Sequence, residues 1–472
     1  MTISDWLRST MWDFLLPQDT EWSERVERYD NYLDYYRGQQ KRQLTVRPQQ
    51  ADDNLTENYT ELVVERSISL MLGDGVEFEL PDESNEEYIE EVMEANRQNI
   101  LLYDAAQNAA IYGTGFIKII PDGAESKQRE NVMLPRLVVL NPAWMQINTD
   151  PEDVGKVTGY EMRYRVGDLA RREVTEVFAQ DEYGRVLSWQ ITSYKADAST
   201  QWKWIQDSQT VWEYEFPPVI HWKNLPWANN AYGRSEVAPI IELQDRINFV
   251  SSNISKIIRY HAHPKTWGRG AGLGNKASWG ADEIVMVNGP DAMLQNLEMQ
   301  SDLVSSREFR DELKAALMEI SRTVDLSSMK DKIGSLTNFG LRVLYNDALD
   351  KTSTKRDTFG EALLELVHRL LVLDNRPGES GYIEWPDPLP VNETERLQSD
   401  GFDLDRGLVS KETISERRGY DFEEEQEKMS SEQQASDNIG SMLLRAFNRG
   451  ETTAAPRLPA MRIQANAEEE EE

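Results

Sequence analysis

Histidines are the first candidates for catalysis or metal binding, because the chain has no cysteine and only four histidines. His261 and His263 stand two residues apart near the end of a predicted helix, and a helix directs such a pair to different faces. No nearby pair of carboxylates completes a metal ligand set. We therefore expect packing or capping roles for this pair, and structural roles for His221 and His368, which stand alone.

A glycine-rich segment is the next candidate, because such segments can cradle phosphate groups. Its glycines are Gly268, Gly270, Gly272 and Gly274. A dinucleotide-binding loop requires a strand, a loop and a helix in that order, whereas this run follows a proline after a helical pattern. The nearest match to a phosphate-binding loop, Gly274-Asn275-Lys276, lacks the required Gly-Lys-Ser or Gly-Lys-Thr. A flexible or tightly packed loop is expected, and a nucleotide-dependent enzyme is kept only as a third hypothesis.

Asp403, Asp405 and Gly407 suggest a calcium-binding loop. Its sixth position is Leu408 and its twelfth is Ile414, where glycine and glutamate are required. No Gly-x-Ser-x-Gly elbow is present to organise a serine nucleophile. The sequence therefore predicts no catalytic residue, no metal site and no cofactor.

The formal charge of −32, from 83 acidic and 51 basic side chains, restricts the possible partners. A protein that grips nucleic acid neutralises phosphates with lysine and arginine, so repressors, polymerases and nucleases with open basic clefts are disfavoured. A conduit through which DNA slides without sticking is compatible with the charge, as are a need for solubility and a saline habitat. No stretch approaches about 18 consecutive apolar residues and no secretory signal is recognisable, so we expect no membrane association and no export.

The elements that must position any site form an α+β pattern. Apolar residues at helical spacing predict helices at residues 22–36, 58–72, 86–112, 304–324 and 336–373. The last of these has an almost wholly polar middle, residues 350–358, which predicts a kink or break there. Alternating and aromatic-rich runs between residues 157 and 222 predict a mainly antiparallel β region. A short strand at residues 116–120 is expected to end at the turn Pro121-Asp122-Gly123.

One further helix, at residues 240–261, has a narrow apolar seam. The seam consists of Ile240, Leu243, Ile247, Val250, Ile254 and Ile257. Such a seam is typical of a helix packed among neighbours in a barrel, and equally of a helix in a bundle within one chain.

The loop between two predicted helices carries two lysines in an acidic chain, and we single it out as a candidate DNA contact. Its residues of interest are Asp325, Ser327, Ser328, Met329, Lys330, Asp331 and Lys332. Taken alone, such a loop is more commonly an ordinary solvated connection.

Several short motifs follow one another in a characteristic order between about residues 35 and 425. They are Tyr35-Tyr36-Arg37-Gly38, Ala110-Ile111-Tyr112-Gly113-Thr114-Gly115-Phe116, His221-Trp222-Lys223-Asn224, Gly233-Arg234-Ser235 and Leu243-Gln244-Asp245-Arg246-Ile247-Asn248. A proline-rich strand with an asparagine-started helix follows at residues 383–395, and a helix start after glycine and serine at residues 407–416. In order and spacing, these pieces resemble the portal proteins of tailed bacteriophages with long non-contractile tails.

The resemblance implies a portal-type subunit with an α/β wing, a two-helix stem, a small α/β clip, a long kinked helix and a helical crown. The expected boundaries are a wing at residues 1–226, stem helices at 227–263 and 301–325, a clip at 264–300, a tunnel loop at 326–335, a kinked helix and return strand at 336–391, a crown at 392–450 and a disordered acidic tail at 451–472.

The resemblance also implies a function. Such subunits form a homo-oligomeric ring, usually of twelve, at one capsid vertex of the virion, and they assemble in the host cytoplasm. Double-stranded DNA is packaged and later ejected through the ring with weak, sequence-independent contacts. The expected protein partners are the terminase large subunit, head-completion or adaptor proteins, and the major capsid and scaffolding proteins. The alternative hypothesis is a capsid-associated adaptor or scaffold that does not conduct DNA.

Overall fold

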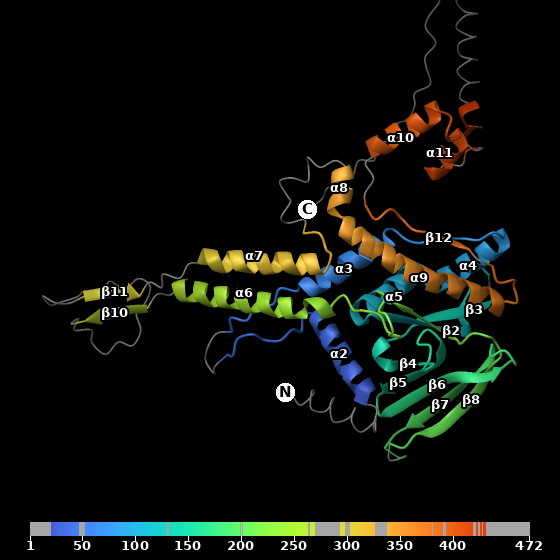
Figure 1. Cartoon of the computed structure of the whole chain (residues 1–472), viewed down its shortest axis with the longest axis horizontal. Coiled ribbons are helices and arrows are strands. Elements are labelled where there is room, and N and C mark those ends of the chain that lie inside the picture. Colours follow the sequence, from blue (N-terminus) through green and yellow to red (C-terminus); the bar gives the residue numbers. More distant parts are fainter. Residues whose placement is uncertain are drawn as a thin grey trace, which may run out of the picture. The chain divides into compact units, whose positions relative to one another are not determined.

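The computed structural model divides the chain into two compact units, Met1–Pro390 and Val391–Glu472. It describes residues 20–46, 52–129, 132–198, 200, 202–262, 265–269, 293–297, 303–325, 338–379, 381–389, 393–418, 422, 425–426 and 428–430. The first unit combines a group of helices with antiparallel sheets, which confirms the predicted α+β fold (Figure 1). Within these ranges, no helix has the length and apolar character needed to cross a membrane.

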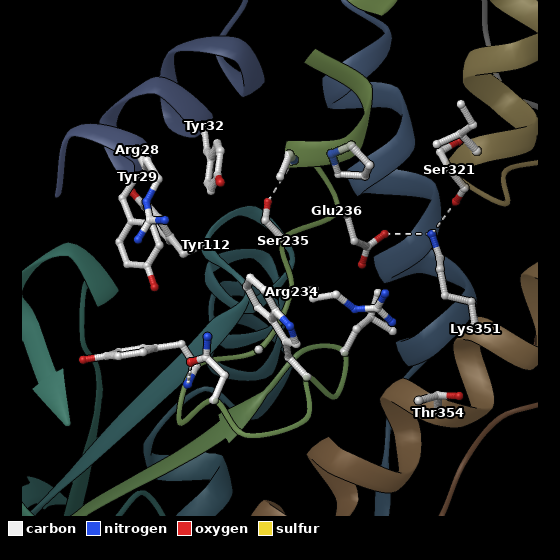
Figure 2. Close-up of a pocket in the computed structure, with 18 of the residues that line it drawn as sticks. Arg28, Tyr29, Tyr32, Tyr112, Arg234, Ser235, Glu236, Ser321, Lys351 and Thr354 are labelled. Carbon is white, nitrogen blue, oxygen red and sulfur yellow. Dashed lines mark hydrogen bonds and ion pairs between the residues drawn. The ribbon is translucent and has the colours of Figure 1, made fainter. Parts of the chain in front are cut away.

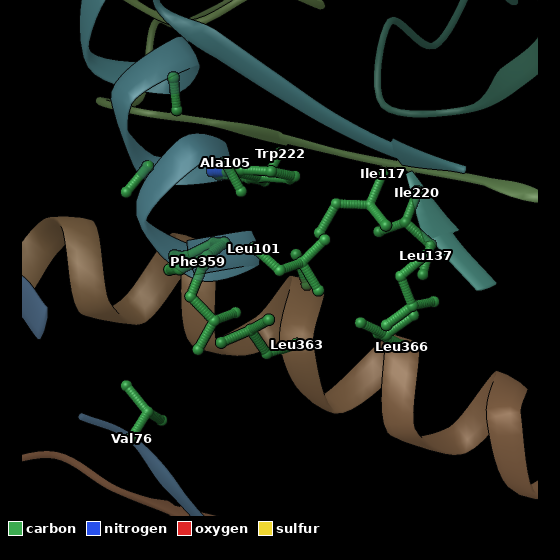
Figure 3. Packing of buried hydrophobic residues seen from close by; sticks show 14 of the residues in the cluster. Val76, Leu101, Ala105, Ile117, Leu137, Ile220, Trp222, Phe359, Leu363 and Leu366 are labelled. Carbon is green, nitrogen blue, oxygen red and sulfur yellow. The ribbon is translucent and has the colours of Figure 1, made fainter. Parts of the chain in front are cut away.

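A layer of helices forms the centre of the first unit. Its members are α2 (Thr20–Tyr36), α3 (Tyr59–Leu72), α4 (Glu83–Ala95), α5 (Gln98–Tyr112) and α9 (Asn346–Leu373). Their apolar faces share one core with a three-stranded sheet. Figure 3 shows Phe359, Leu363 and Leu366 of α9 facing Leu101 of α5 and Ile117 of the sheet. Burial of these stripes is what holds the helices against the sheet.

The two larger sheets of the first unit are both antiparallel. The smaller has the order β3-β2-β9, from β2 (Thr114–Glu125), β3 (Met133–Val139) and β9 (Val219–Lys223). The larger has the order β4-β5-β6-β7-β8, from β4 (Met145–Thr149), β5 (Val157–Val166), β6 (Leu169–Gln180), β7 (Val186–Ala196) and β8 (Ile205–Trp212). These strands confirm the predicted antiparallel region. The expected turn at residues 121–123 is instead an irregularity inside β2, where the pairing with β3 shifts between Ile120 and Ala124 and Asp122 has a φ of 51°.

The junction between α5 and β2 depends on two glycines. Gly113 has a φ of 94°, and a Cβ at Gly233 would lie 2.3 Å from the Gly113 carbonyl oxygen. Any side chain at Gly233 would therefore force the two backbone segments apart.

A pair of long helices extends the first unit. They are α6 (Ile241–Ala262), which follows the 3-10 turn η2 (Ala238–Ile240), and α7 (Leu303–Ile320). The start of α6 contacts the end of α7, so the two helices lie side by side and antiparallel (Figure 1). In sequence they flank an antiparallel pair of strands, β10 (Lys265–Arg269) and β11 (Met293–Leu297).

The helix predicted at residues 86–112 is in fact two helices, and the single-helix prediction is wrong. They separate at Asn96 and Arg97, where Arg97 has a left-handed φ of 56°. The Asn96 side chain donates to the Pro135 carbonyl and accepts from the Leu137 amide. Contacts with β3 therefore fix a break that the apolar pattern does not reveal.

The predicted position of the kink in residues 336–373 is also wrong. The break lies at Tyr345, between α8 (Asn338–Leu344) and α9, and α9 continues without interruption through residues 350–358. The polar side chains Lys351, Thr352 and Lys355 are buried there. Their polarity serves an internal network and does not interrupt the helix.

One strand and two helices follow α9 in the described part of the chain. Strand β12 (Tyr382–Glu384) returns to pair with β1 (Glu77–Glu79) in the first unit. The described part of the second unit contains α10 (Glu393–Asp405) and α11 (Lys411–Arg417), at the positions where the sequence predicts helices.

Candidate functional site at the root of the α6 and α7 helix pair

The apolar seam of α6 packs within the chain over its first half. Ile240 and Ile247 are fully buried, and they form one cluster with Leu317 and Met318 of α7 and Val63 of α3. Leu243 is partly buried against this cluster, and Val250 is also buried. Ile254 and Ile257, further along α6, are only partly buried. The end of the helix pair next to α3, which we call its root, is therefore a three-helix bundle. The outer half of α6 keeps apolar side chains that the chain covers only in part.

A strap formed by residues 52–58 fastens α6 to α7. The Arg310 guanidinium of α7 donates to both carboxylate oxygens of Glu57, over 2.9 and 2.5 Å. The Ser251 hydroxyl of α6 donates to the same carboxylate, and the Asn248 side chain of α6 accepts from the Glu57 backbone amide over 2.9 Å. Burial alone would raise the pKa of Glu57, but the hydrogen bonds from Arg310 and Ser251 keep it below its usual value. One carboxylate thus ties both helices to the strap.

A buried charge cluster lies where the helix pair meets the rest of the first unit. The Glu236 carboxylate accepts from Lys351 over 2.8 Å and from Lys355 over 2.7 Å, and at most 7% of any of these side chains is exposed. Lys351 also donates to the carbonyl of Ser321, just after α7, over 2.9 Å. Lys355 donates to the Ser67 hydroxyl of α3, also over 2.9 Å. The cluster therefore joins α3, α9 and the end of α7.

Charge balance within this cluster is uneven, because two lysines share one carboxylate. Burial by itself would raise the pKa of Glu236, but the charges of Lys351 and Lys355 lower it to about 2. Burial lowers the pKa of Lys355 below its usual value, although Glu236 opposes the shift. Glu236 therefore stays ionised at neutral pH, and its charge is what makes two buried ammonium groups tolerable.

The chain after α7 leads directly into the predicted tunnel loop. Asp325 is described and forms an ion pair with Lys314 of α7, with 2.9 Å between Oδ2 and Nζ. Arg322 has a left-handed φ of 54°, which turns the chain away from the helix. The other predicted loop residues lie outside the described residues: Ser327, Ser328, Met329, Lys330, Asp331 and Lys332.

A cavity of about 600 Å³ adjoins the charge cluster, between α2, the connection from β9 to α6, the end of α7 and α9. Figure 2 shows Tyr29, Tyr32 and Tyr112 on one side of it, and Ser321 and Lys351 on the other. Its volume lies within the range of about 300–1,000 Å³ typical of small-molecule sites.

The remaining candidates from the sequence fall elsewhere. The Nδ1 atom of His221 is 2.7 Å from the Tyr160 hydroxyl in the sheet region, and the His368 ring lies against Gly378. Gly268 is in β10, paired with Leu294, whereas His263, Gly270, Gly272, Gly274 and Lys276 lie outside the described residues. In the parts of the chain that the structure describes, no three metal-ligating side chains come together.

The calcium-like motif occupies the end of a helix. Asp403 and Asp405 are in the last turn of α10, and Gly407 follows with a φ of 67°. A glycine of positive φ just beyond a helix is the common way to end it.

Sequence reasoning missed the Glu236 cluster. It also missed the Glu57 clasp, the contacts by which the Glu57 carboxylate joins Ser251 of α6 to Arg310 of α7. Its one usable signal was the polar run at residues 350–358, because lysines four residues apart share one face of a helix. Their partner Glu236 lies 115 and 119 residues away in the chain. No local pattern connects residues at that separation.

The chain matches one protein family over most of its length. The family model described as "Phage portal protein, SPP1 Gp6-like" matches residues 17–438. Among solved structures, one described as the neck of a native GTA particle computed with C12 symmetry is 14% identical, with a TM-score of 0.42, and the match covers 76% of this chain and 89% of that one. No curated protein sequence matches. By the extent of the family match, this chain belongs to the phage portal protein family, SPP1 Gp6-like.

Proposed function

We propose that copies of this chain form a closed ring, with twelve as the expected number, through which double-stranded DNA is packaged into a capsid and later ejected. Membership of the portal family is the observation that carries this proposal. A ring of this kind uses two different complementary faces on each subunit, so neither face needs to be self-symmetric or strongly apolar.

The α6 and α7 pair is the proposed stem, and residues 264–300 between the two helices are the proposed clip, the docking place for terminase and later for head-completion proteins. Both helices are anchored at their root by the apolar cluster around Ile247, and near their middle by the contacts of Glu57 with Ser251 and Arg310. The apolar surface left on the outer half of α6, at Ile254 and Ile257, supports packing of the stem against a neighbouring copy.

DNA is proposed to pass the tunnel loop with brief phosphate contacts. The loop candidates are Lys330 and Lys332, in a chain whose formal charge of −32 discourages adhesion of the duplex elsewhere. The negative surface favours sliding, and the two lysines offer isolated contacts.

Single-particle imaging of the purified full-length protein tests the ring. We expect a closed ring with an axial opening of at least about 20 Å, enough for a duplex as judged from its groove dimensions. A closed assembly without such an opening, or a protein that stays monomeric, would instead favour a capsid-associated adaptor or scaffold.

An in vitro packaging assay tests the loop. The Lys330→Glu/Lys332→Glu double variant is expected to form rings normally but to package less DNA, because it replaces phosphate contacts with repulsion. A matched control is Lys195→Glu/Lys203→Glu, which makes the same charge change in and beside the larger sheet. Equal packaging yields for the two variants would remove the proposed role of the loop lysines.

A further inference from the structure

The cavity next to the charge cluster is basic, although the chain as a whole is strongly acidic. Its lining contains one carboxylate, Glu236, and five cationic side chains: Arg25, Arg28, Arg234, Arg322 and Lys351. Glu236 is already engaged by two lysines, so it does not neutralise the arginines. The chain has 83 acidic residues against 51 basic ones, so this local excess of positive charge runs against its composition.

Three of these arginines are exposed on the cavity surface: Arg28, Arg234 and Arg322. Among the described residues, no carboxylate forms an ion pair with any of them, whereas Arg310, Arg369 and Arg376 are all paired. A guanidinium presents a rigid fork of donors that matches the oxygens of phosphate or carboxylate groups. The three arginines therefore leave their donor groups available to an anion from outside the chain.

A fourth arginine contributes to the cavity from inside the protein. Arg25 is only 6% exposed and lines the cavity. One of its Nη atoms donates to the Met145 carbonyl over 3.1 Å, but its Nε has no partner within the described part of the chain. Because that Nε is closed off from solvent and the guanidinium lies over the Tyr232 ring, Arg25 adds positive charge to the cavity wall and no free donor.

The remaining wall of the cavity is largely aromatic. It is formed by Tyr29, Tyr32, Tyr112, Trp227 and Tyr232. Tyr29 and Tyr112 lie with ring centroids 5.2 Å apart, and Trp227 is 52% exposed. Tyr29 and Tyr112 are buried and Arg25 lies over the Tyr232 ring, so Tyr32 and Trp227 are the rings left to stack on a planar group, as aromatic side chains do on nucleobases.

We propose that this cavity binds a polyphosphate-bearing ligand of the nucleoside triphosphate kind, with its phosphates on Arg28, Arg234 and Arg322. A single carboxylate has too few oxygens to engage three guanidinium groups, whereas two or three linked phosphates have enough. No phosphate transfer or hydrolysis is proposed. The site is binding only, and it is independent of whether the protein conducts DNA.

The position of the cavity gives such binding a consequence. Ser321 and Arg322 directly follow α7 and precede the proposed tunnel loop. Lys351 lines the cavity and donates to the Ser321 carbonyl. A ligand held there would restrain the end of α7. This consequence, unlike the binding itself, rests on the proposed function.

Isothermal titration of the purified full-length protein with ATP, tripolyphosphate and adenosine tests the site. We expect ATP and tripolyphosphate to bind, with affinity that falls as salt rises, and adenosine to bind at least tenfold more weakly than ATP. ATP binding tighter than tripolyphosphate would identify a nucleotide, and equal binding would identify an inorganic polyphosphate. Failure of both at about 1 mM would overturn the proposal.

A matched pair of variants locates the binding. Arg28→Gln/Arg234→Gln is expected to weaken ATP by about tenfold or more, whereas Arg136→Gln/Arg185→Gln, which removes two exposed arginines outside the cavity, is expected to bind like the wild type. Hydrogen exchange of residues 313–324 should slow on adding ATP to the wild type. Equal affinities of the two variants would place any binding elsewhere and overturn the assignment, whatever the outcome of ring imaging or DNA packaging.

Discussion

Replacing Glu236 with glutamine leaves the ammonium groups of Lys351 and Lys355 inside the protein without a counter-charge. Breaking a buried ion pair in this way costs about 3–5 kcal/mol. A second route gives a similar figure, because discharging one lysine at pH 7 costs about 4.6 kcal/mol for an ordinary pKa of about 10.4. We therefore expect Glu236→Gln to destabilise the first unit by about 3–5 kcal/mol.

Replacing Lys355 with methionine provides the contrast. This change leaves one lysine facing one carboxylate, so the buried charge becomes balanced while hydrogen bonds to Glu236 and Ser67 are lost. The expected cost is about 1–2 kcal/mol, clearly below that of Glu236→Gln. Lys195→Met serves as a surface control, because its pair with Asp207 is 44% and 32% exposed and should contribute less than about 1 kcal/mol.

Urea unfolding followed by tryptophan fluorescence measures these differences. For an m-value of about 2 kcal/mol/M, a difference of about 2 kcal/mol moves the midpoint by about 1 M. If Lys355→Met destabilised the protein as much as Glu236→Gln, uneven charge would not be what makes the cluster sensitive, and the reasoning would fail.

The pH dependence offers an independent check of the same cluster. Since the two lysines lower the pKa of Glu236 to about 2, its stabilising charge is fully present above its usual pKa near 4.5 and is lost as the pH falls toward 2. Glu236→Gln should lack this loss. Wild type and variant should therefore approach each other in stability as the solution is acidified.

Three further outcomes follow from other contacts. Burial, with help from the charges of Lys223 and Arg369, lowers the pKa of His221 to about 4. The protein should therefore lose stability as the pH falls from about 6.5 to 4, and His221→Gln should lose less. Urea midpoints at pH 7 and pH 5 measure the difference. Gly233→Ala should cost more than about 2 kcal/mol in the same assay, because its Cβ would meet the Gly113 carbonyl, whereas Gly184→Ala, with open space around it, should cost about 1 kcal/mol for its positive φ. Arg310→Met should speed hydrogen exchange of residues 52–58, and unchanged exchange would mean that the Glu57 carboxylate does not hold the strap.

Periodicity predicted the elements that bury one continuous stripe. The helices around Val26, Ile68, Ile247 and Leu317 each have apolar residues at helical spacing, and each is found where the sequence placed it. The spacing of apolar residues is a local signal, because it is visible in one stretch of sequence whatever the helix packs against.

Boundaries and polar sites were predicted less well, for a different reason. The break at Asn96 depends on hydrogen bonds to β3, and the continuity of α9 depends on Glu236 receiving Lys351 and Lys355. The basic cavity likewise gathers arginines from α2, from the connection before α6 and from the end of α7. Each feature is made by residues that meet only after folding, so a single stretch of sequence shows one partner of the contact and not the other.

The antiparallel course of α6 and α7 has a consequence for how this family can change. The chain leaves the body at Ile240 and returns at Leu317 and Met318, and these three residues lie in one buried cluster. Seven residues added to each helix would lengthen the α6 and α7 pair by about 10 Å. The apolar seam would be preserved, and the rest of the first unit would be unchanged. Evolution can therefore adjust the reach of this arm in whole heptads. A paired insertion of that kind, outside the Glu57 clasp, should leave the urea midpoint of the protein unchanged.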